Sequence, residues 1–144
     1  MDNVKKVLNK EVANFAVLYI KLHNYHWFVK GKMFYTLHEK FEEFYDAVTG
    51  YYDEVAERLL MLGGRPAATM KEYLSLATIQ EASGNETTED MIKAIIQDFE
   101  TINAELAEGV KAAADAGDEV TVDLFVTISS DLQKNVWMLK TLME

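Results

Sequence analysis

Apolar residues recur at helical spacing along four long stretches of the chain, which predicts an all-α protein. The four stretches cover about residues 4–29, 34–62, 87–117 and 121–144. A period near 3.6 residues is typical of an amphipathic helix that buries one face. Gly31 interrupts the pattern after the first stretch, and Gly63-Gly64-Arg65-Pro66 ends the second, as expected of a glycine cap followed by proline.

The connections predict how the four helices are arranged. Short turns join the first helix to the second and the third to the fourth, so each pair should be antiparallel neighbours. About 24 residues, 63–86, separate the second helix from the third, which is longer than an ordinary bundle turn. This crossover contains its own short helical candidate, residues 71–77. A four-helix bundle with one long crossover is the ferritin-like arrangement, and we expect residues 1–144 to form one such domain.

Composition and charge narrow the class of protein. Apolar residues make up 49% of the chain, which favours a globular domain over a disordered one. The formal net charge of −10 argues against nonspecific nucleic-acid binding, because that binding depends on Lys and Arg neutralising phosphates. The absence of cysteine excludes disulfides and thiolate metal sites. With no signal-peptide pattern or membrane-length apolar run, we expect a cytoplasmic protein without a membrane partner that attracts cations.

Five side chains in the first 57 residues are potential ligands for a borderline metal ion: His26, His38, Glu42, Asp53 and Glu57. On one continuous helix the last four fall within roughly 100° of one another. Glu42 and Asp53 are nevertheless eleven residues apart, which is about 16 Å along a helix axis, whereas metal–ligand bonds are about 2 Å long. One helix cannot bring both pairs to one ion. A second copy lying antiparallel across a two-fold axis can, which gives two identical shared sites per dimer.

A less specific interpretation of these residues stays open. The two pairs on the helix could be solvated surface residues, and His26 could be an ordinary core histidine. A di-metal centre inside a ferritin-like bundle would need Glu-x-x-His on two helices, and this motif occurs nowhere in the chain. Any metal site is therefore expected between subunits and not inside the bundle.

Two local motifs resemble the signatures of the Dps family of mini-ferritins. The first is His26-Trp27-Phe28-Val29-Lys30-Gly31, then Leu37-His38, then Glu42; the second is Tyr52-Asp53-Glu54-Val55-Ala56-Glu57-Arg58, then Leu62-Gly63-Gly64-Arg65-Pro66. They cover about a quarter of the chain, and the helix layout extends the resemblance over essentially all of it. The resemblance implies a hollow homododecamer that oxidises ferrous iron, preferably with hydrogen peroxide, and stores the ferric mineral inside.

The resemblance also implies a role for each candidate ligand. His26, His38 and Glu42 match the ligands given by one subunit, and Asp53 and Glu57 match those given by its two-fold partner. The family often has Asp where this chain has Glu42, so the carboxylate here is one methylene longer. A site of imidazoles and carboxylates suits ferrous iron, although zinc, cobalt and manganese would also bind.

Two further aromatic side chains lie near His26 in the sequence. The resemblance implies that Trp27 lies close to the iron site and takes up oxidising equivalents; a packing aromatic is the open alternative. His23 comes one helical turn before His26 and matches no family position. For His23 we expect a surface or packing role.

Acidic residues gather at the turn between the third and fourth helices. The resemblance implies that acids here line three-fold pores through which ferrous iron enters, and Glu119 and Asp123 match two of those positions. Ala114 stands where a third acid is expected, and Asp115 or Asp118 could substitute for it. The alternative role is capping, because the helix dipole favours acids at the start of a helix.

Direct DNA binding varies within the Dps family, and members that bind commonly use a flexible, lysine-rich tail. Here Lys5, Lys6 and Lys10 already lie in helical pattern, and the last residue is Glu144. We therefore expect a bacterial iron-storage ferroxidase that protects DNA by removing iron and peroxide, without direct DNA binding. A DNA-compacting structural protein and a non-catalytic metal-binding or adhesion cage are the alternatives.

Overall fold

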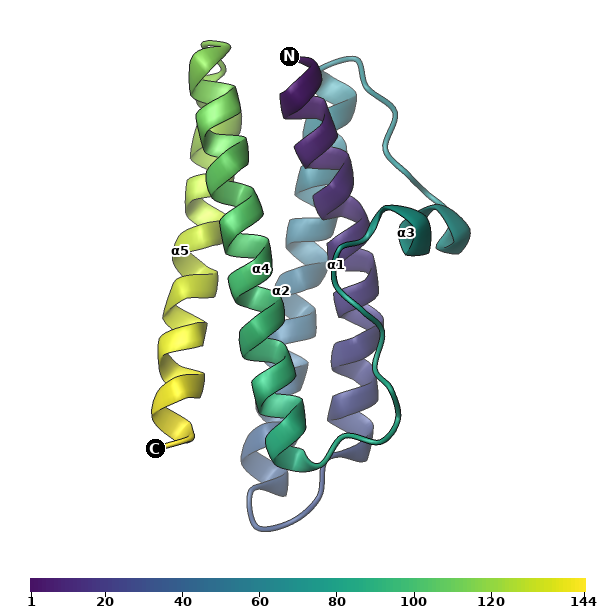
Figure 1. Cartoon of the computed structure of the whole chain (residues 1–144), viewed down its shortest axis with the longest axis vertical. Helices are drawn as coiled ribbons and strands as arrows, with labels where there is room; N and C mark the ends of the chain where they lie inside the picture. Colours follow the sequence, from purple (N-terminus) through teal and green to yellow (C-terminus); the bar gives the residue numbers. More distant parts are fainter.

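The computed structural model describes all 144 residues, which form five helices and no strands. The helices are α1 (Asp2–Phe28), α2 (Phe34–Met61), α3 (Met70–Leu76), α4 (Thr88–Asp115) and α5 (Glu119–Leu142). The four long helices form the bundle, and α3 lies to one side of it on the crossover between α2 and α4 (Figure 1). The all-α class, the four long helices and the short crossover helix are confirmed, and each boundary lies within two residues of its predicted position.

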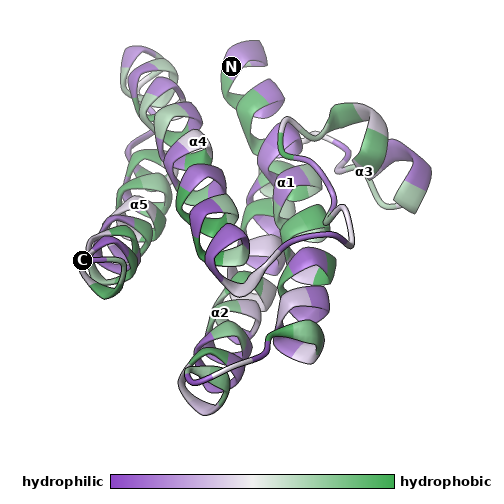
Figure 2. Cartoon of the chain, turned by 60° about the horizontal axis from the view of Figure 1, so that its bottom comes forward, coloured by the Kyte–Doolittle hydropathy of each residue, from purple (hydrophilic) through white to green (hydrophobic).

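The helices pair as their connections predict. Helix α2 runs antiparallel to α1, and α5 runs antiparallel to α4 (Figure 1). Each long ribbon carries hydrophobic and hydrophilic residues in alternation, as an amphipathic helix does (Figure 2). The buried apolar side chains form one continuous core of 31 residues, which includes Phe15, Phe41, Phe99 and Phe125. Burying one such phenylalanine stabilises the fold by about 1.5–3 kcal/mol.

Local sequence signals set the ends of α2 and α4. Gly63 has a φ of 80°, and the N–H groups of Gly63 and Gly64 donate to the carbonyls of Leu60 and Leu59 at 2.9 Å each. This pair of bonds is the Schellman motif that ends a helix on a left-handed glycine. At the start of α4, Thr87 forms a capping box with Asp90. Helix α2 is therefore a single uninterrupted rod that carries four of the five candidate ligands.

Polar side chains along α1 hold the crossover against the bundle. Asn9 accepts a hydrogen bond from the Ala67 N–H at 2.8 Å, and Asn14 accepts one from the Thr78 N–H at 2.8 Å. Further along α1, the Lys21 ammonium donates to the Gln80 carbonyl at 2.8 Å, and the Tyr25 hydroxyl donates to the Glu86 carboxylate at 2.7 Å. The crossover is thus tied to α1 at four places. None of the five helices has the length and apolar character needed to cross a membrane.

Candidate metal centre

His26 and His38 hold each other in one fixed geometry where α1 lies beside α2. His26 Nδ1 lies 2.6 Å from the His38 carbonyl oxygen, and His38 Nδ1 lies 2.7 Å from the His26 carbonyl oxygen. The two rings are stacked, with centroids 3.7 Å apart and planes 12° apart. A carbonyl oxygen only accepts, so each Nδ1 carries a proton, and in the neutral ring each Nε2 keeps its lone pair. This is the tautomer that a metal-binding histidine needs, fixed by its second nitrogen.

Glu42 joins this pair from the next turn of α2. Its Oε1 lies 3.8 Å from His26 Nε2, the nitrogen that the hydrogen bonds leave free. The Glu42 side chain is 53% exposed, whereas that of His26 is 8% exposed. The chain therefore brings the three predicted residues of one subunit together, with the buried imidazole of His26 and the half-buried imidazole of His38 behind an accessible carboxylate.

Asp53 and Glu57 form a separate pair of carboxylates further along α2. Both are exposed. The pKa of Glu57 is raised, first by a hydrogen bond with Asp53, then by the charge of Asp53 and by burial. Two facing carboxylates repel each other, and a bound cation relieves that repulsion. The pair is accordingly suited to a cation, and the role of Asp53 and Glu57 as metal ligands stays a prediction.

The structure keeps the two groups apart. Eleven residues of uninterrupted α2 separate Glu42 from Asp53, which is about 16 Å of helix. Within one chain, no three His, Asp or Glu side chains are arranged to hold a metal ion. The chain presents two incomplete groups, the His26–His38–Glu42 group and the Asp53–Glu57 group.

Aromatic side chains that include His23 pack beside the His26–His38–Glu42 group. The His23 ring is stacked on Tyr45 with centroids 3.7 Å apart, and its Nδ1 donates to the Tyr19 carbonyl at 2.8 Å. Trp27 meets the edge of His23 at 5.5 Å and is 65% exposed. His23 thus has the packing role expected of it, and the oxidation role of Trp27 stays a prediction. Tyr45 was missed, although its position three residues after Glu42 places it on the same face of α2.

The acids at the α4–α5 turn divide into two kinds. Asp118 is buried and is the N-cap of α5; its Oδ1 accepts from the Thr121 N–H at 3.1 Å and from Arg58 Nη2 at 2.7 Å. Burial favours a higher pKa for Asp118, but the hydrogen bonds from Thr121 and Arg58 outweigh it and lower the pKa. Asp118 therefore caps α5, a role that is compatible with lining a pore. Asp115, Glu119 and Asp123 are exposed, and the pore role of all four acids stays a prediction.

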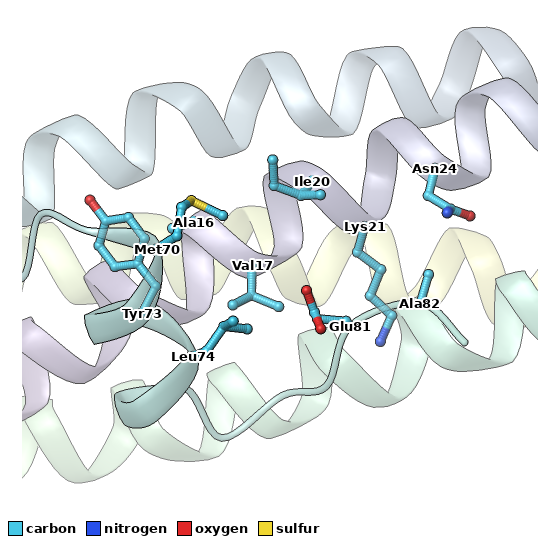
Figure 3. Close-up of a pocket in the computed structure, with 10 residues that line it drawn as sticks. All are labelled: Ala16, Val17, Ile20, Lys21, Asn24, Met70, Tyr73, Leu74, Glu81 and Ala82. Carbon is cyan, nitrogen blue, oxygen red and sulfur yellow. The ribbon is translucent and has the colours of Figure 1, made fainter. Parts of the chain in front are cut away.

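An uncovered apolar surface lies between the two groups of candidate ligands. Tyr73 and Leu74 of α3 lie beside Ala16 and Val17 of α1 in a groove of about 170 Å³ (Figure 3). A second hollow of about 380 Å³ adjoins it and extends to α2; its lining includes Tyr19, Ile20, Thr49, Tyr52 and Met70. We call the two together the α1–α3 groove. Ile20, Met70 and Leu74 are each at least 50% exposed, and apolar patches of this kind mark interaction surfaces.

Comparison with known proteins adds independent observations. The ferritin-like domain model matches residues 5–144. The chain is 51% identical to general stress protein 20U of Bacillus subtilis over 96% of each chain. It is 52% identical to DNA protection during starvation protein 2 of Bacillus anthracis, over 95% of this chain and 94% of the relative.

Solved structures of Dps proteins are also similar to this chain. A Dps protein from Bacillus brevis is 45% identical with a TM-score of 0.96, over 98% of this chain and 95% of that one. Dps from Staphylococcus aureus is 41% identical with a TM-score of 0.98, over 100% of this chain and 97% of that one. Fold and sequence are therefore similar over essentially the whole length of each protein.

Proposed function

The chain belongs to the Dps family of ferritin-like proteins, and on this premise we propose that it oxidises ferrous iron and stores the ferric product. The observation that carries the proposal is the reciprocal bonding of His26 and His38. It presents two lone-pair nitrogens together beside the exposed carboxylate of Glu42. Imidazole with carboxylate is a ligand set that ferrous iron accepts.

A second copy of the chain completes the site. Two α2 helices lying antiparallel across a two-fold axis set the His26–His38–Glu42 group of one copy against Asp53 and Glu57 of the other. The α1–α3 groove lies between these groups and supplies apolar surface for the contact. Six such dimers closed into a homododecamer form the proposed cage, with Glu119 and Asp123 at pores through which ferrous iron enters.

Hydrogen peroxide is the proposed electron acceptor. Two ferrous ions give one electron each, and peroxide takes both electrons and two protons to become two water molecules. Because both electrons are transferred at one shared site, no hydroxyl radical, the one-electron product, is released. The carboxylates of Glu42, Asp53 and Glu57 stabilise the higher charge of the ferric product. The ferric ions then form mineral in the cavity, which protects DNA in a bacterial cytoplasm by removing iron and peroxide.

Two other functions fit the fold less well. A DNA-compacting structural protein would need basic surface, and the formal charge of this chain is −10. A non-catalytic adhesion cage would not need two fixed histidine tautomers beside a carboxylate, whereas a non-catalytic metal-binding cage would. Oxidation kinetics separate that alternative from a ferroxidase.

The test is anaerobic oxidation of ferrous iron by a measured amount of peroxide. The purified protein should consume two ferrous ions for each peroxide, faster than buffer alone, with little hydroxyl radical detected by a spin trap. Replacement of the ligand His38→Ala should slow the reaction by about 100-fold. The matched control is His23→Ala, which removes a histidine from the same face of the bundle and should keep the fast reaction. A wild-type protein no faster than buffer would overturn the proposal.

A further inference from the structure

A buried polar cluster that includes none of the candidate metal ligands lies between α1, α4 and the crossover. Asn14 Nδ2 lies 3.1 Å from Glu11 Oε1, 3.0 Å from Thr78 Oγ1 and 2.9 Å from Glu105 Oε1. The Thr78 hydroxyl donates to the same Glu105 oxygen at 3.1 Å, and the Thr78 N–H donates to Asn14 Oδ1. Glu11 and Asn14 are completely buried. At this cluster the crossover segment that follows α3 contacts the bundle.

The two carboxyl groups of this cluster meet at one donor, because Asn14 Nδ2 lies within hydrogen-bond distance of an oxygen of each. Two buried carboxyl groups this close together favour a state in which one of them keeps its proton. Burial, followed by the hydrogen bond and the charge of Glu105, raises the pKa of Glu11 well above its usual range. Lys10 is the facing cation, with its Nζ 3.5 Å from Glu105 Oε2. Glu11 Oε2 is buried and has no hydrogen-bond partner.

The charges around the pair balance only while that proton is bound. Lys10 and Glu11 face the cluster from α1 and Glu105 faces it from α4, whereas the crossover contributes the uncharged Thr78. One lysine compensates one carboxylate. A second carboxylate without a cation is costly inside the protein, so its ionisation favours opening of the cluster toward water.

We propose that the protonated Glu11–Glu105 pair is a pH-dependent fastening of the crossover, which holds Thr78 and Ile79 on Asn14 and releases them when the proton is lost. The hydrogen bonds to the crossover at Asn9, Lys21 and Tyr25 do not depend on this proton. Release is therefore local and begins in the segment that follows α3.

The direction of the pH dependence follows from the raised pKa of Glu11. The closed cluster binds a proton that the open segment, with an ordinary glutamate, gives up at lower pH. The fastening is therefore fully present below the ordinary pKa of glutamate and weakens as the pH rises toward the raised pKa. One linked proton increases the open fraction by up to about tenfold per pH unit in this window. Above the raised pKa the closed state has also lost its proton, and the dependence ends.

Release of this segment also affects the α1–α3 groove, because the segment follows directly after α3. Met70, Tyr73 and Leu74 of α3 line that groove (Figure 3). Loosening the segment therefore loosens one wall of the groove. Within the proposed cage, which is a separate proposal, this wall contacts the second copy.

The test is hydrogen exchange of the assembled, iron-free protein, followed by mass spectrometry over a series of pH values and corrected for the intrinsic exchange rate. In the wild type, protection of the peptide that contains Thr78 and Ile79 should fall with rising pH, by up to about tenfold per unit. Protection of the peptide that contains Ser83 and Gly84, held by Glu86, should stay constant. No iron is involved, so the result is independent of whether the protein is a ferroxidase.

Matched variants separate this pair from general charge effects. In Glu11→Gln the side-chain amide donates to Glu105 as the protonated carboxyl does, so protection at Thr78 should stay high at every pH. Glu108→Gln removes the same charge from an exposed position one turn after Glu105 and should behave as the wild type. If Glu11→Gln does not fold, Glu105→Gln carries the same expectation. Constant protection in the wild type, or an equally steep loss in the Gln variant, would overturn the proposal.

Discussion

Two sets of acidic side chains in this protein differ in whether the same chain supplies them with a cationic partner. The buried acids each have donors from the same chain: Asp98 pairs with Lys21 at 2.7 Å, and Asp118 pairs with Arg58 at 2.7 Å. The exposed acids of the candidate site, Glu42, Asp53 and Glu57, have no Lys or Arg partner, and Asp53 and Glu57 instead face each other. Buried charge is thus stabilised within the chain, whereas the charge of these three carboxylates has no partner in the chain. The candidate site is distinguished by carboxylates that have no cationic partner in the chain, more than by the number of its carboxylates.

The largest expected effect is on stability, at the buried set. Lys21→Met leaves Asp98 buried without its cation, which should lower the free energy of unfolding by about 3–5 kcal/mol. The control is Lys40→Met, which breaks the exposed ion pair with Glu43 and should change that free energy by about 0.5 kcal/mol or less. Denaturant unfolding at equal protein concentration measures both. Equal losses in the two variants would remove the distinction between the sets.

A smaller effect is expected on iron uptake, at the exposed acids of α5. If Glu119 and Asp123 line a pore, the variants Glu119→Gln and Asp123→Asn should slow uptake at low ferrous concentration. The field that attracts the ion is screened within about 10 Å at 0.1 M salt, so the difference from wild type should shrink as ionic strength rises. Glu108→Gln, at an exposed position of α4 outside the predicted pore set, is the matched control. Unchanged uptake at low salt would leave these acids without a pore role.

The smallest expected effect is on DNA. A chain with a formal charge of −10 should be repelled by duplex phosphates, since affinity depends on the number of phosphates that Lys and Arg neutralise. We expect no gel shift of linear DNA in the presence of a chelator, together with protection of that DNA against iron and peroxide. Tight binding that resists the chelator would reveal a basic patch that the net charge conceals.

Local signals in the sequence predicted the helices and the candidate ligands. The glycine end of α2 and the Thr87–Asp90 capping box depend on residues a few positions apart, so they can be read directly from the chain. The placement of His38, Glu42, Asp53 and Glu57 on one stripe follows from helical spacing alone. The shared intersubunit site remains a prediction, because one chain cannot show it.

Contacts between distant residues could not be predicted in this way. Glu11 and Lys21 read as surface charges in a helical pattern, yet both are buried, because the crossover and α4 fold over them. Their partners Glu105, Asp98 and Gln80 lie at least 59 positions away. The bond between Asp118 and Arg58, which lies 60 positions earlier in the chain, likewise could not be predicted from the local sequence. The hydrogen bonds between His26 and His38 also depend on how α1 and α2 are packed.

The central claim, a site shared between two copies, is tested most directly by mixing two inactive variants. His26→Ala and Asp53→Ala should each lose fast peroxide-dependent oxidation of ferrous iron. In a dimer of one with the other, one site carries both defects and the second carries neither. Random mixing should therefore restore about a quarter of the wild-type activity. If mass spectrometry proves that the subunits have mixed and no activity returns, the site is not shared, and the account is contradicted.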